Sequence, residues 1–300
     1  MKYVDEQPIV VGVDGSLPAL HAVRWAAGEA QRRGAPLRLV HACNVVPVRH
    51  PVRLAPPSEF RDAILTEGRH WLNTAADTAR RAVPGVAPST DLRDGGTAEI
   101  LVAESASAQL VVLGSRGLGG FAGLLLGSVT LALAAHAHCP VVVMPTSTVS
   151  CAPADHGPVV VGVDGSALSE AAVEFAFMAA AMRGAPLHAV HTWLDLDMAA
   201  TWAPRLAAAP DAIDWAALKA EETQLLDDTL IGWRDKFPDV ELRRFVERDR
   251  PQHALLRRAS GAQLLVVGSR GRAALTGLGL GSVSQTLLHH ATCPVAVMRA

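Results

Sequence analysis

Short runs of β-branched residues alternate with longer amphipathic stretches along the whole chain. In the first half, the apolar runs predict strands at Ile9–Val13, Leu37–Ala42, Ser89–Leu92, Leu110–Gly114 and Val141–Met144. The spacing of apolar residues between them predicts helices at Ala19–Arg33, Glu59–Val83, Thr97–Ser107 and Ser128–Ala137. The main strands are apolar on both faces, which is typical of a parallel sheet covered by helices on both sides. Right-handed crossovers make a doubly wound, five-stranded Rossmann-like sheet of class α/β the simplest arrangement.

This sequence pattern occurs twice in the chain, as an internal repeat. The segment VVGVDGS occurs at 10–16 and 160–166, and RRGAPLRLVHAC at 32–43 matches MRGAPLHAVHTW at 182–193. Further on, AQLVVLGSRG at 108–117 matches AQLLVVGSRG at 262–271, and AHCPVVVMP at 137–145 matches ATCPVAVMR at 291–299. Matches in one order over this length indicate a duplicated domain rather than a solenoid repeat. We expect two tandem Rossmann-like domains, 1–147 and 157–300, joined by a linker at about 146–158.

Local signals mark the ends of the first helix. Ser16 is a favourable N-cap residue, and Pro18 suits the first turn. Gly34 follows the last residue of the apolar pattern and predicts the helix end.

The composition excludes several classes of protein. Half of the 300 residues are hydrophobic, 19% are charged and the net charge is −2, so we expect an ordered globular protein that does not bind nucleic acid. The cysteines show no metal-binding spacing and are expected to be buried in a reducing compartment, which favours a cytoplasmic location. The stretch 117–135 has no charge for 19 residues, but it contains five glycines and its counterpart carries Arg272. A buried loop and helix is therefore expected there, with no membrane span.

The strongest candidate chemistry is a glycine-rich loop after the fourth strand. Gly114-Ser115-Arg116-Gly117, nine residues and Gly127-Ser128 are matched by Gly268-Ser269-Arg270-Gly271, nine residues and Gly281-Ser282. Glycines let backbone N–H groups approach an anion, and a helix start adds the positive end of its dipole. The two arginines either add charge at a phosphate or are solvated on the surface. The loop is neither a Walker A motif nor a dinucleotide-binding fingerprint.

These residues resemble the universal stress proteins of the adenine-nucleotide-binding type. The resemblance covers both halves and is similar to the tandem form found in actinobacteria, mycobacteria included. It implies up to two ATP molecules per chain, with Asp14 and Asp164 beside the nucleotide, close backbone approach at Gly12 and Gly162, and Ala42 and Thr192 at the adenine edge. It also implies phosphate and ribose contacts from two sets of loop residues: Gly114, Gly117, Gly127, Ser128 and Val129, and Gly268, Gly271, Gly281, Ser282 and Val283.

A carboxylate beside a triphosphate is repulsive, so Asp14 and Asp164 need an explanation. Each either shares a Mg²⁺ or Mn²⁺ with the phosphates or accepts a hydrogen bond from the nucleotide. The alternative is that Asp14 merely caps the turn at Ser16. Asp195 is a further candidate for a ribose contact, although Val45 stands at its place in the first copy.

No nucleophile is paired with a base, so no catalytic residue is predicted. The resemblance implies a nucleotide-dependent regulator of stress response or growth arrest. A slow ATP hydrolase using the same sites, and a nucleotide-free interaction scaffold, are the alternatives. We expect the two halves to form an intrachain pseudo-dimer, with a homodimer of chains and a regulatory protein as further partners. His41 and His191, in matched strand positions, are expected to be buried and hydrogen-bonded rather than catalytic.

Overall fold

The computed structural model describes residues 7–43, 57–118, 126–145, 156–193, 214–271 and 279–299. The chain divides into two compact units, residues 1–152 together with 299–300, and residues 153–298. Each unit is a doubly wound α/β fold and is described by itself.

Unit 1 alternates strands and helices from one end to the other. Its elements are β1 (Ile9–Gly12), α1 (Leu17–Arg33), β2 (Leu37–Cys43), α2 (Pro57–Ala82), β3 (Ser89–Asp94), α3 (Thr97–Ser105), β4 (Leu110–Gly114), α4 (Ser128–His136) and β5 (Val141–Met144). The strands are parallel in the order β3-β2-β1-β4-β5. The first strand is therefore central, with β2 on one side and β4 on the other.

Unit 2 repeats this topology. Its elements are β6 (Val159–Val163), α5 (Ala167–Arg183), β7 (Leu187–Thr192), α7 (Trp215–Lys236), β8 (Leu242–Glu247), α8 (Pro251–Arg258), β9 (Leu264–Gly268), α9 (Ser282–His290) and β10 (Val295–Met298). The strand order β8-β7-β6-β9-β10 is again parallel throughout. The predicted fold class is confirmed.

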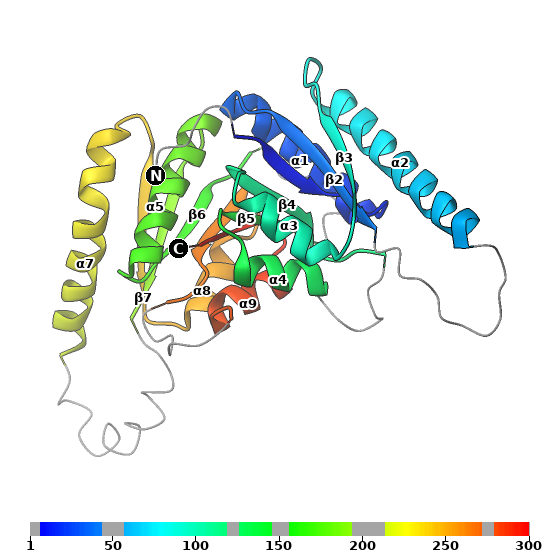
Figure 1. Ribbon diagram of the computed structural model, residues 1–300. Coiled ribbons are helices and arrows are strands. Elements are labelled where there is room, and N and C mark those ends of the chain that lie inside the picture. Colours follow the sequence, from blue (N-terminus) through cyan, green and yellow to red (C-terminus); the bar gives the residue numbers. More distant parts are fainter. Residues whose placement is uncertain are drawn as a thin grey trace. The chain divides into compact units, whose positions relative to one another are not determined.

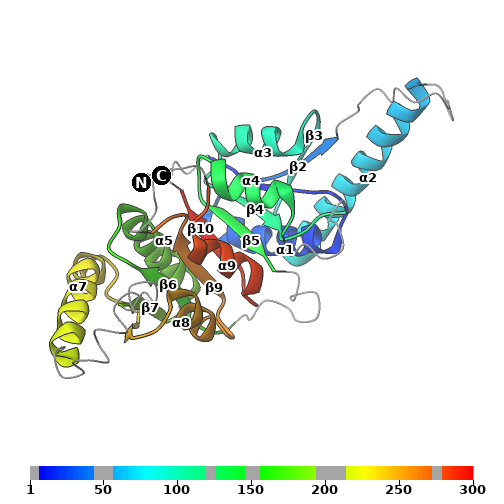
Figure 2. The same cartoon turned by 90° about the horizontal axis from the view of Figure 1, so that it is seen from below.

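Helices cover both faces of each sheet. In unit 1, α1 packs against α2 on one face and α3 packs against α4 on the other, as Figures 1 and 2 show. In unit 2, α5 packs against α7, and α8 against α9. The central strands lie between these layers, and Ile9, Val10 and Val11 are completely buried. Burial on both faces explains why these strands read as uninterrupted apolar runs.

The predicted signals at the ends of α1 are confirmed. The Ser16 hydroxyl accepts a hydrogen bond from the Ala19 N–H at 3.3 Å. Gly34 ends the helix in the left-handed conformation, with φ at 63°. All four predicted helices of unit 1 differ slightly at an end. Both α1 and α2 begin two residues earlier than their apolar patterns, α2 ends one residue earlier at Ala82, α3 ends at Ser105 and α4 ends at His136. The apolar spacing does not register such terminal turns.

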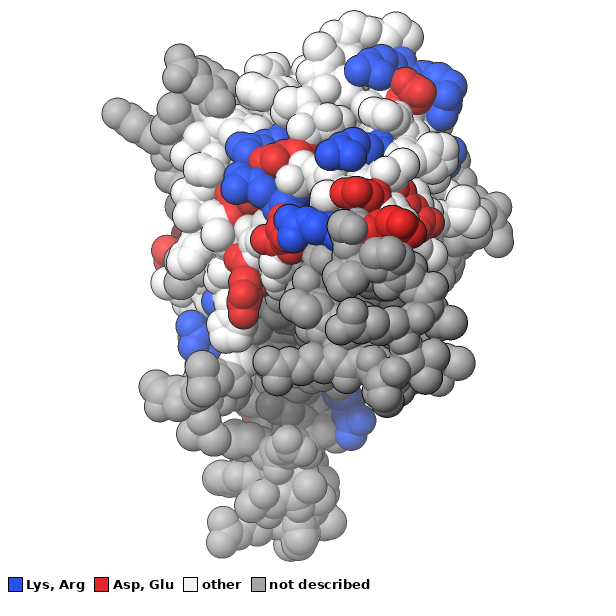
Figure 3. All heavy atoms as spheres, turned by 45° about the vertical axis from the view of Figure 1, so that its right-hand side comes forward, with Lys and Arg blue, Asp and Glu red and all other residues white. Residues whose placement is uncertain are grey.

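Charged side chains of both signs are interspersed on the face that Figure 3 shows. At β3, Asp91 forms ion pairs with Arg38 at 2.6 Å and with Arg93 at 2.8 Å, and Arg93 also pairs with Glu104. This mixture agrees with the near-neutral composition, and the absence of nucleic-acid binding stays a prediction. In the part of the chain with assigned positions, no helix combines the length and the apolar character that a bilayer crossing requires.

The thiols of Cys139 and Cys293, just before β5 and β10, are buried, and burial raises the pKa of each to about 12. Because the thiolate is the reactive species, we expect neither to react with a disulfide reagent at pH 8 until the protein is denatured. The measurement is the labelled fraction in Cys43→Ser/Cys151→Ser, which retains only these two thiols. Rapid labelling of the native protein would contradict the prediction.

The raised pKa of these two thiols also predicts how the stability of the protein changes at alkaline pH. The stability contributed by the protonated thiols is fully present below the unfolded pKa of about 8.5. It is lost as the pH rises through the folded pKa, about 12 in both cases.

Candidate functional site

Each unit has a cavity at the carboxyl ends of its parallel strands. In unit 1 its volume is about 350 Å³, and in unit 2 it is about 380 Å³. The cavity of unit 1 lies between the ends of β1 and β4, and that of unit 2 lies between the ends of β6 and β9. The chain leaves these two strands toward opposite faces of the sheet, which opens a crevice where such folds bind ligands.

Most residues that the sequence predicts for the site line these cavities. In unit 1 they are Gly12, Asp14, Gly114, Arg116, Gly117, Gly127, Ser128 and Val129. In unit 2 they are Gly162, Asp164, Thr192, Gly268, Arg270, Gly271, Gly281, Ser282 and Val283. Asp195 lies outside the described residues.

Ser115, Ser269 and Ala42 lie beside the cavities rather than on their walls. The Ser115 N–H donates to the Met144 carbonyl at 2.9 Å, and its own carbonyl accepts from the Gly127 N–H at 2.8 Å. Ser269 makes the same two bonds, to Met298 and Gly281. These serines therefore fasten both ends of the glycine-rich loop to the sheet. Ala42 reaches the site indirectly, because its carbonyl accepts a bond from the hydroxyl of Thr97, which does line the cavity.

The glycine at the end of β4 is required by the packing of α1. A Cβ on Gly114 would lie 2.8 Å from Cβ of Pro18 and 2.9 Å from its carbonyl carbon. Backbone cannot move aside as a flexible side chain can. Gly114 thus lets the first turn of α1 approach the strand that carries the loop.

The helices that begin at the cavities have no side-chain caps. The N-cap residues of α4 and α9 are Gly127 and Gly281, and neither helix has a capping hydrogen bond from a side chain. This contrasts with α1 and α5, where Ser16 and Ser166 accept from the first turn. An uncapped first turn presents backbone N–H groups and a partial positive charge. The first two residues of each helix, Ser128 and Val129 in unit 1 and Ser282 and Val283 in unit 2, line the cavities.

The hydroxyl at the third position of each helix anchors its first turn. Thr130 Oγ1 donates to the Gly114 carbonyl at 3.1 Å, and Ser284 Oγ donates to the Ser269 carbonyl at 2.9 Å. The helix start is thereby held against the end of β4 or β9, so the N–H groups have a fixed direction.

The Asp14 carboxylate joins the loop after β1 to the glycine-rich loop. One oxygen accepts from the Ser16 N–H at 3.0 Å, and the other accepts from the Leu118 N–H at 2.8 Å. In unit 2, Asp164 accepts from both the N–H and the hydroxyl of Ser166. The turn-capping role is therefore observed, and it coexists with a place on the cavity wall.

Gly117 and Gly271 lie directly against these carboxylates. A Cβ on Gly271 would lie 2.7 Å from Oδ2 of Asp164, and a Cβ on Gly117 would clash with Oδ2 of Asp14. The second glycine of the motif thus provides space for the aspartate of the first loop, a reason that the spacing alone does not reveal.

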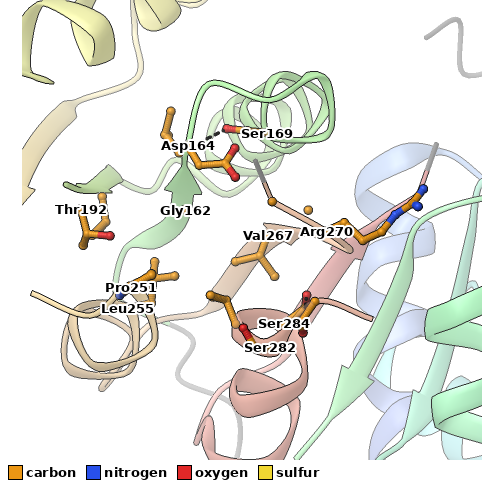
Figure 4. Close-up of a pocket in the computed structure, with 16 residues that line it drawn as sticks. Gly162, Asp164, Ser169, Thr192, Pro251, Leu255, Val267, Arg270, Ser282 and Ser284 are labelled. Atoms are coloured by element: carbon orange, nitrogen blue, oxygen red, sulfur yellow. Dashed lines mark hydrogen bonds between the residues drawn. The ribbon is translucent and has the colours of Figure 1, made fainter. Parts of the chain in front are cut away.

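The arginines of the motif, Arg116 and Arg270, also line the cavities. Figure 4 shows the Arg270 guanidinium pointing away from Asp164 and from the Ser282 hydroxyl. In unit 1, Nε of Arg116 is buried and has no hydrogen-bond partner within the described ranges. A phosphate contact by either side chain stays a prediction.

The sequence did not predict the apolar side of each cavity. In unit 1 it is formed mainly by Val13, Val40, Trp71, Leu101 and Leu113. In unit 2 the corresponding wall has Val163, Val190, Leu255 and Val267, with Pro251 beside them. In the sequence these residues are indistinguishable from ordinary core residues. They come together at the cavity only through the order of the strands and the packing of the helices. Each cavity therefore has a polar end at the loop and an apolar end toward the second strand.

The matched histidines are buried and hydrogen-bonded. Nδ1 of His41 lies 2.7 Å from the Val13 carbonyl, and Nδ1 of His191 lies 2.7 Å from the Val163 carbonyl. Each imidazole thus fixes the end of its central strand. Nε2 of His191 also contacts Glu222 at 2.8 Å. Neither histidine is among the described residues that line the cavities, and their non-catalytic character stays a prediction.

Comparison with known proteins places both units in one family. The model of the universal stress protein family matches residues 6–145 and again residues 156–299. The chain belongs to the universal stress protein family. One universal stress protein of Mycobacterium tuberculosis is 38% identical over 294 residues, which cover 97% of this chain and 96% of the relative. Another from the same species is 40% identical over 313 residues, covering 97% and 94%.

A solved structure supports the fold of this universal stress protein. The crystal structure of a universal stress protein from Archaeoglobus fulgidus covers 98% of this chain and 96% of its own, with a TM-score of 0.69. At 20% sequence identity, that likeness concerns the fold alone. The tandem organisation of the mycobacterial type is confirmed by the full-length relatives.

Proposed function

We propose that this universal stress protein binds adenine nucleotide in both cavities, up to two ATP molecules per chain, and that their occupancy regulates an interaction in stress response or growth arrest. The observation that carries the proposal is that α4 and α9 begin on the cavity walls, each after a glycine N-cap and without a capping bond from a side chain. Free N–H groups at a helix start bind phosphate with no need for lysine or arginine. A net charge of −2 is therefore compatible with two phosphate sites.

The apolar end of each cavity suits the base. Aliphatic side chains line it: Val13, Val40 and Leu101 in unit 1, and Val163, Val190 and Leu255 in unit 2. A ligand that is apolar at one end and anionic at the other, as a nucleotide is, complements both ends. Cavities of this size and mixed lining are typical of small-molecule sites.

A divalent cation fits only together with the phosphates. Each cavity offers one carboxylate, Asp14 or Asp164, and the described residues include no group of three or more His, Cys, Asp or Glu that could hold a metal. Mg²⁺ is usually bound by one or two carboxylates, phosphate oxygens and water. Asp14 and Asp164 are therefore proposed as single protein ligands for Mg²⁺ or Mn²⁺, the cation offsetting their repulsion of phosphate.

The test is the chemical identity of the bound ligand. Natively purified protein is denatured, and the released small molecules are identified and counted by mass spectrometry. Isothermal titration with ATP, with and without Mg²⁺, gives the number of sites. One or two adenine nucleotides released or bound per chain would support the proposal. No released nucleotide together with no titration heat would leave the scaffold alternative as the function.

Hydrolysis is tested separately by steady-state phosphate release. For a binding regulator we expect turnover at background. Turnover well above background that disappears in Asp14→Ala/Asp164→Ala would instead identify the protein as a slow ATP hydrolase.

A homodimer and a regulatory protein partner are further parts of the proposal. Sedimentation with and without ATP would show whether nucleotide occupancy changes the assembly.

A further inference from the structure

The apolar ends of the two cavities differ in one large side chain. In unit 1, Trp71 of α2 forms part of the wall. In unit 2, no described residue of α7, the equivalent helix, lines the cavity. The duplicated sequence, aligned at the glycine-rich loops, places Leu225 at the position of Trp71 and Glu222 at that of Gly68.

Two neighbours contact the Trp71 ring, and a third residue makes room for one of them. It meets the imidazole of His41 edge-on, with ring centres 5.0 Å apart and planes at 89°. Its indole covers Gly15, where a Cβ would lie 2.6 Å from the ring and where φ is +82°. One turn earlier in α2, Gly68 leaves room for His41, because a Cβ there would lie 2.7 Å from the imidazole. The two glycines and the histidine therefore bring α2 close enough for the indole to reach the cavity.

Unit 2 uses the same positions differently. Glu222, in place of Gly68, contacts Nε2 of His191 at 2.8 Å. Two residues with hydroxyls, Ser169 and Thr192, line its cavity. They correspond to Ala19, which lines the cavity of unit 1, and to Ala42, which lies beside it. Conversely, Pro251 replaces Thr97. The apolar end of the cavity in unit 1 thus includes an aromatic ring. In unit 2 that end is aliphatic and has the Thr192 hydroxyl, whereas Ser169 lies beside Asp164 (Figure 4).

We propose that Trp71 contacts the base of the nucleotide in unit 1 and makes that cavity selective for purine over pyrimidine nucleotides, so that the two sites of one chain are not equivalent. The inference rests on the proposed function and adds a specificity-determining residue to it. An indole offers a large flat apolar surface, and the two fused rings of a purine cover more of it than the single ring of a pyrimidine. Contact between a base and an aromatic side chain is sensitive to the overlapping area and tolerant of the hydrogen-bonding edge.

The test isolates each site and replaces the tryptophan by the residue that unit 2 carries. Gly271→Ala weakens the site of unit 2, so titration of that variant reports unit 1, and Gly117→Ala reports unit 2. Affinities for ATP and CTP are measured in both backgrounds with and without Trp71→Leu. We expect Trp71→Leu to weaken ATP binding by unit 1 about tenfold, and to reduce its preference for ATP over CTP by a similar factor. Unit 2 should be unchanged.

Trp71→Phe is the matched control, because a smaller aromatic ring should retain part of the selectivity. Thermal unfolding of each variant without ligand shows whether α2 keeps its place. Equal ATP-to-CTP ratios before and after Trp71→Leu, in a folded protein that binds ATP, would overturn this inference and leave the proposed function intact. Failure of every variant and of the parent protein to bind any nucleotide would overturn the proposed function itself.

Discussion

Gly117→Ala is expected to weaken ATP binding by unit 1 about 10- to 100-fold, with Gly271→Ala acting similarly but less strongly on unit 2. The new Cβ on Gly117 would clash with Oδ2 of Asp14 and displace the carboxylate that bonds the Leu118 N–H. In unit 2 the same Cβ would lie 2.7 Å from Asp164. Losing one hydrogen bond to a charged group, together with the loop geometry that depends on it, corresponds to this range.

Isothermal titration of the single and double variants provides the measurement. Two matched controls are available. In Gly28→Ala of α1 the new Cβ would approach the end of Arg32 at 3.5 Å, and in Gly232→Ala of α7 no described atom apart from the chain neighbours and the helix backbone lies within 4 Å of the new Cβ. Both should bind like the parent protein. Parent-like affinity in Gly117→Ala/Gly271→Ala would show that the glycine-rich loops do not form the ligand sites.

Phe177→Ala is expected to lower the unfolding free energy of unit 2 by about 3–5 kcal/mol. Phe177 is completely buried on α5 and stacks with Phe237 and Trp233, at ring-centre distances of 5.8 and 6.5 Å. Its removal leaves a cavity between α5 and α7 that the two remaining rings cannot fill without leaving their own contacts. The loss is a large part of the roughly 5–15 kcal/mol that stabilises a typical domain.

Urea unfolding followed by tryptophan fluorescence measures this loss. Ile231→Ala on α7 is the control, because Ile231 is 63% exposed and its truncation should change stability by less than about 0.5 kcal/mol. A change below about 1 kcal/mol for Phe177→Ala would show that α7 does not pack on α5 as described.

The fold of each unit could be predicted from the sequence because its signals are local. Uninterrupted runs such as those at β1 and β4 follow from burial on both faces, and Ser16 and Gly34 act on their immediate neighbours. The duplication also gave each predicted helix and strand a counterpart with a similar pattern in the other half of the chain. What failed were helix ends such as those of α2, which the apolar pattern does not register.

The candidate site could be predicted only in its polar half. The glycine-rich loops and Asp14 or Asp164 lie in short motifs with fixed spacing. Trp71 and Leu101 reach the cavity from α2 and α3 through packing, and neither stands in a recognisable motif. The clash of a Gly117 Cβ with Asp14 also could not be predicted, since it depends on contact between residues more than a hundred positions apart. The sequence predicts close approach of the backbone to an anion at this glycine, and the structure adds that the glycine accommodates the Asp14 carboxylate.

The uncapped starts of α4 and α9 have a consequence for how long the folded protein survives. A helix end that a ligand completes makes the ligand part of the native state, so resistance to unfolding rises with ligand concentration. Under the proposed function, one nucleotide bound at a concentration of 100 times Kd would add about 2.7 kcal/mol to the stability of the unit that holds it. Loss of that nucleotide would then raise the unfolded fraction of the unit and its exposure to proteolysis, with no catalytic step involved.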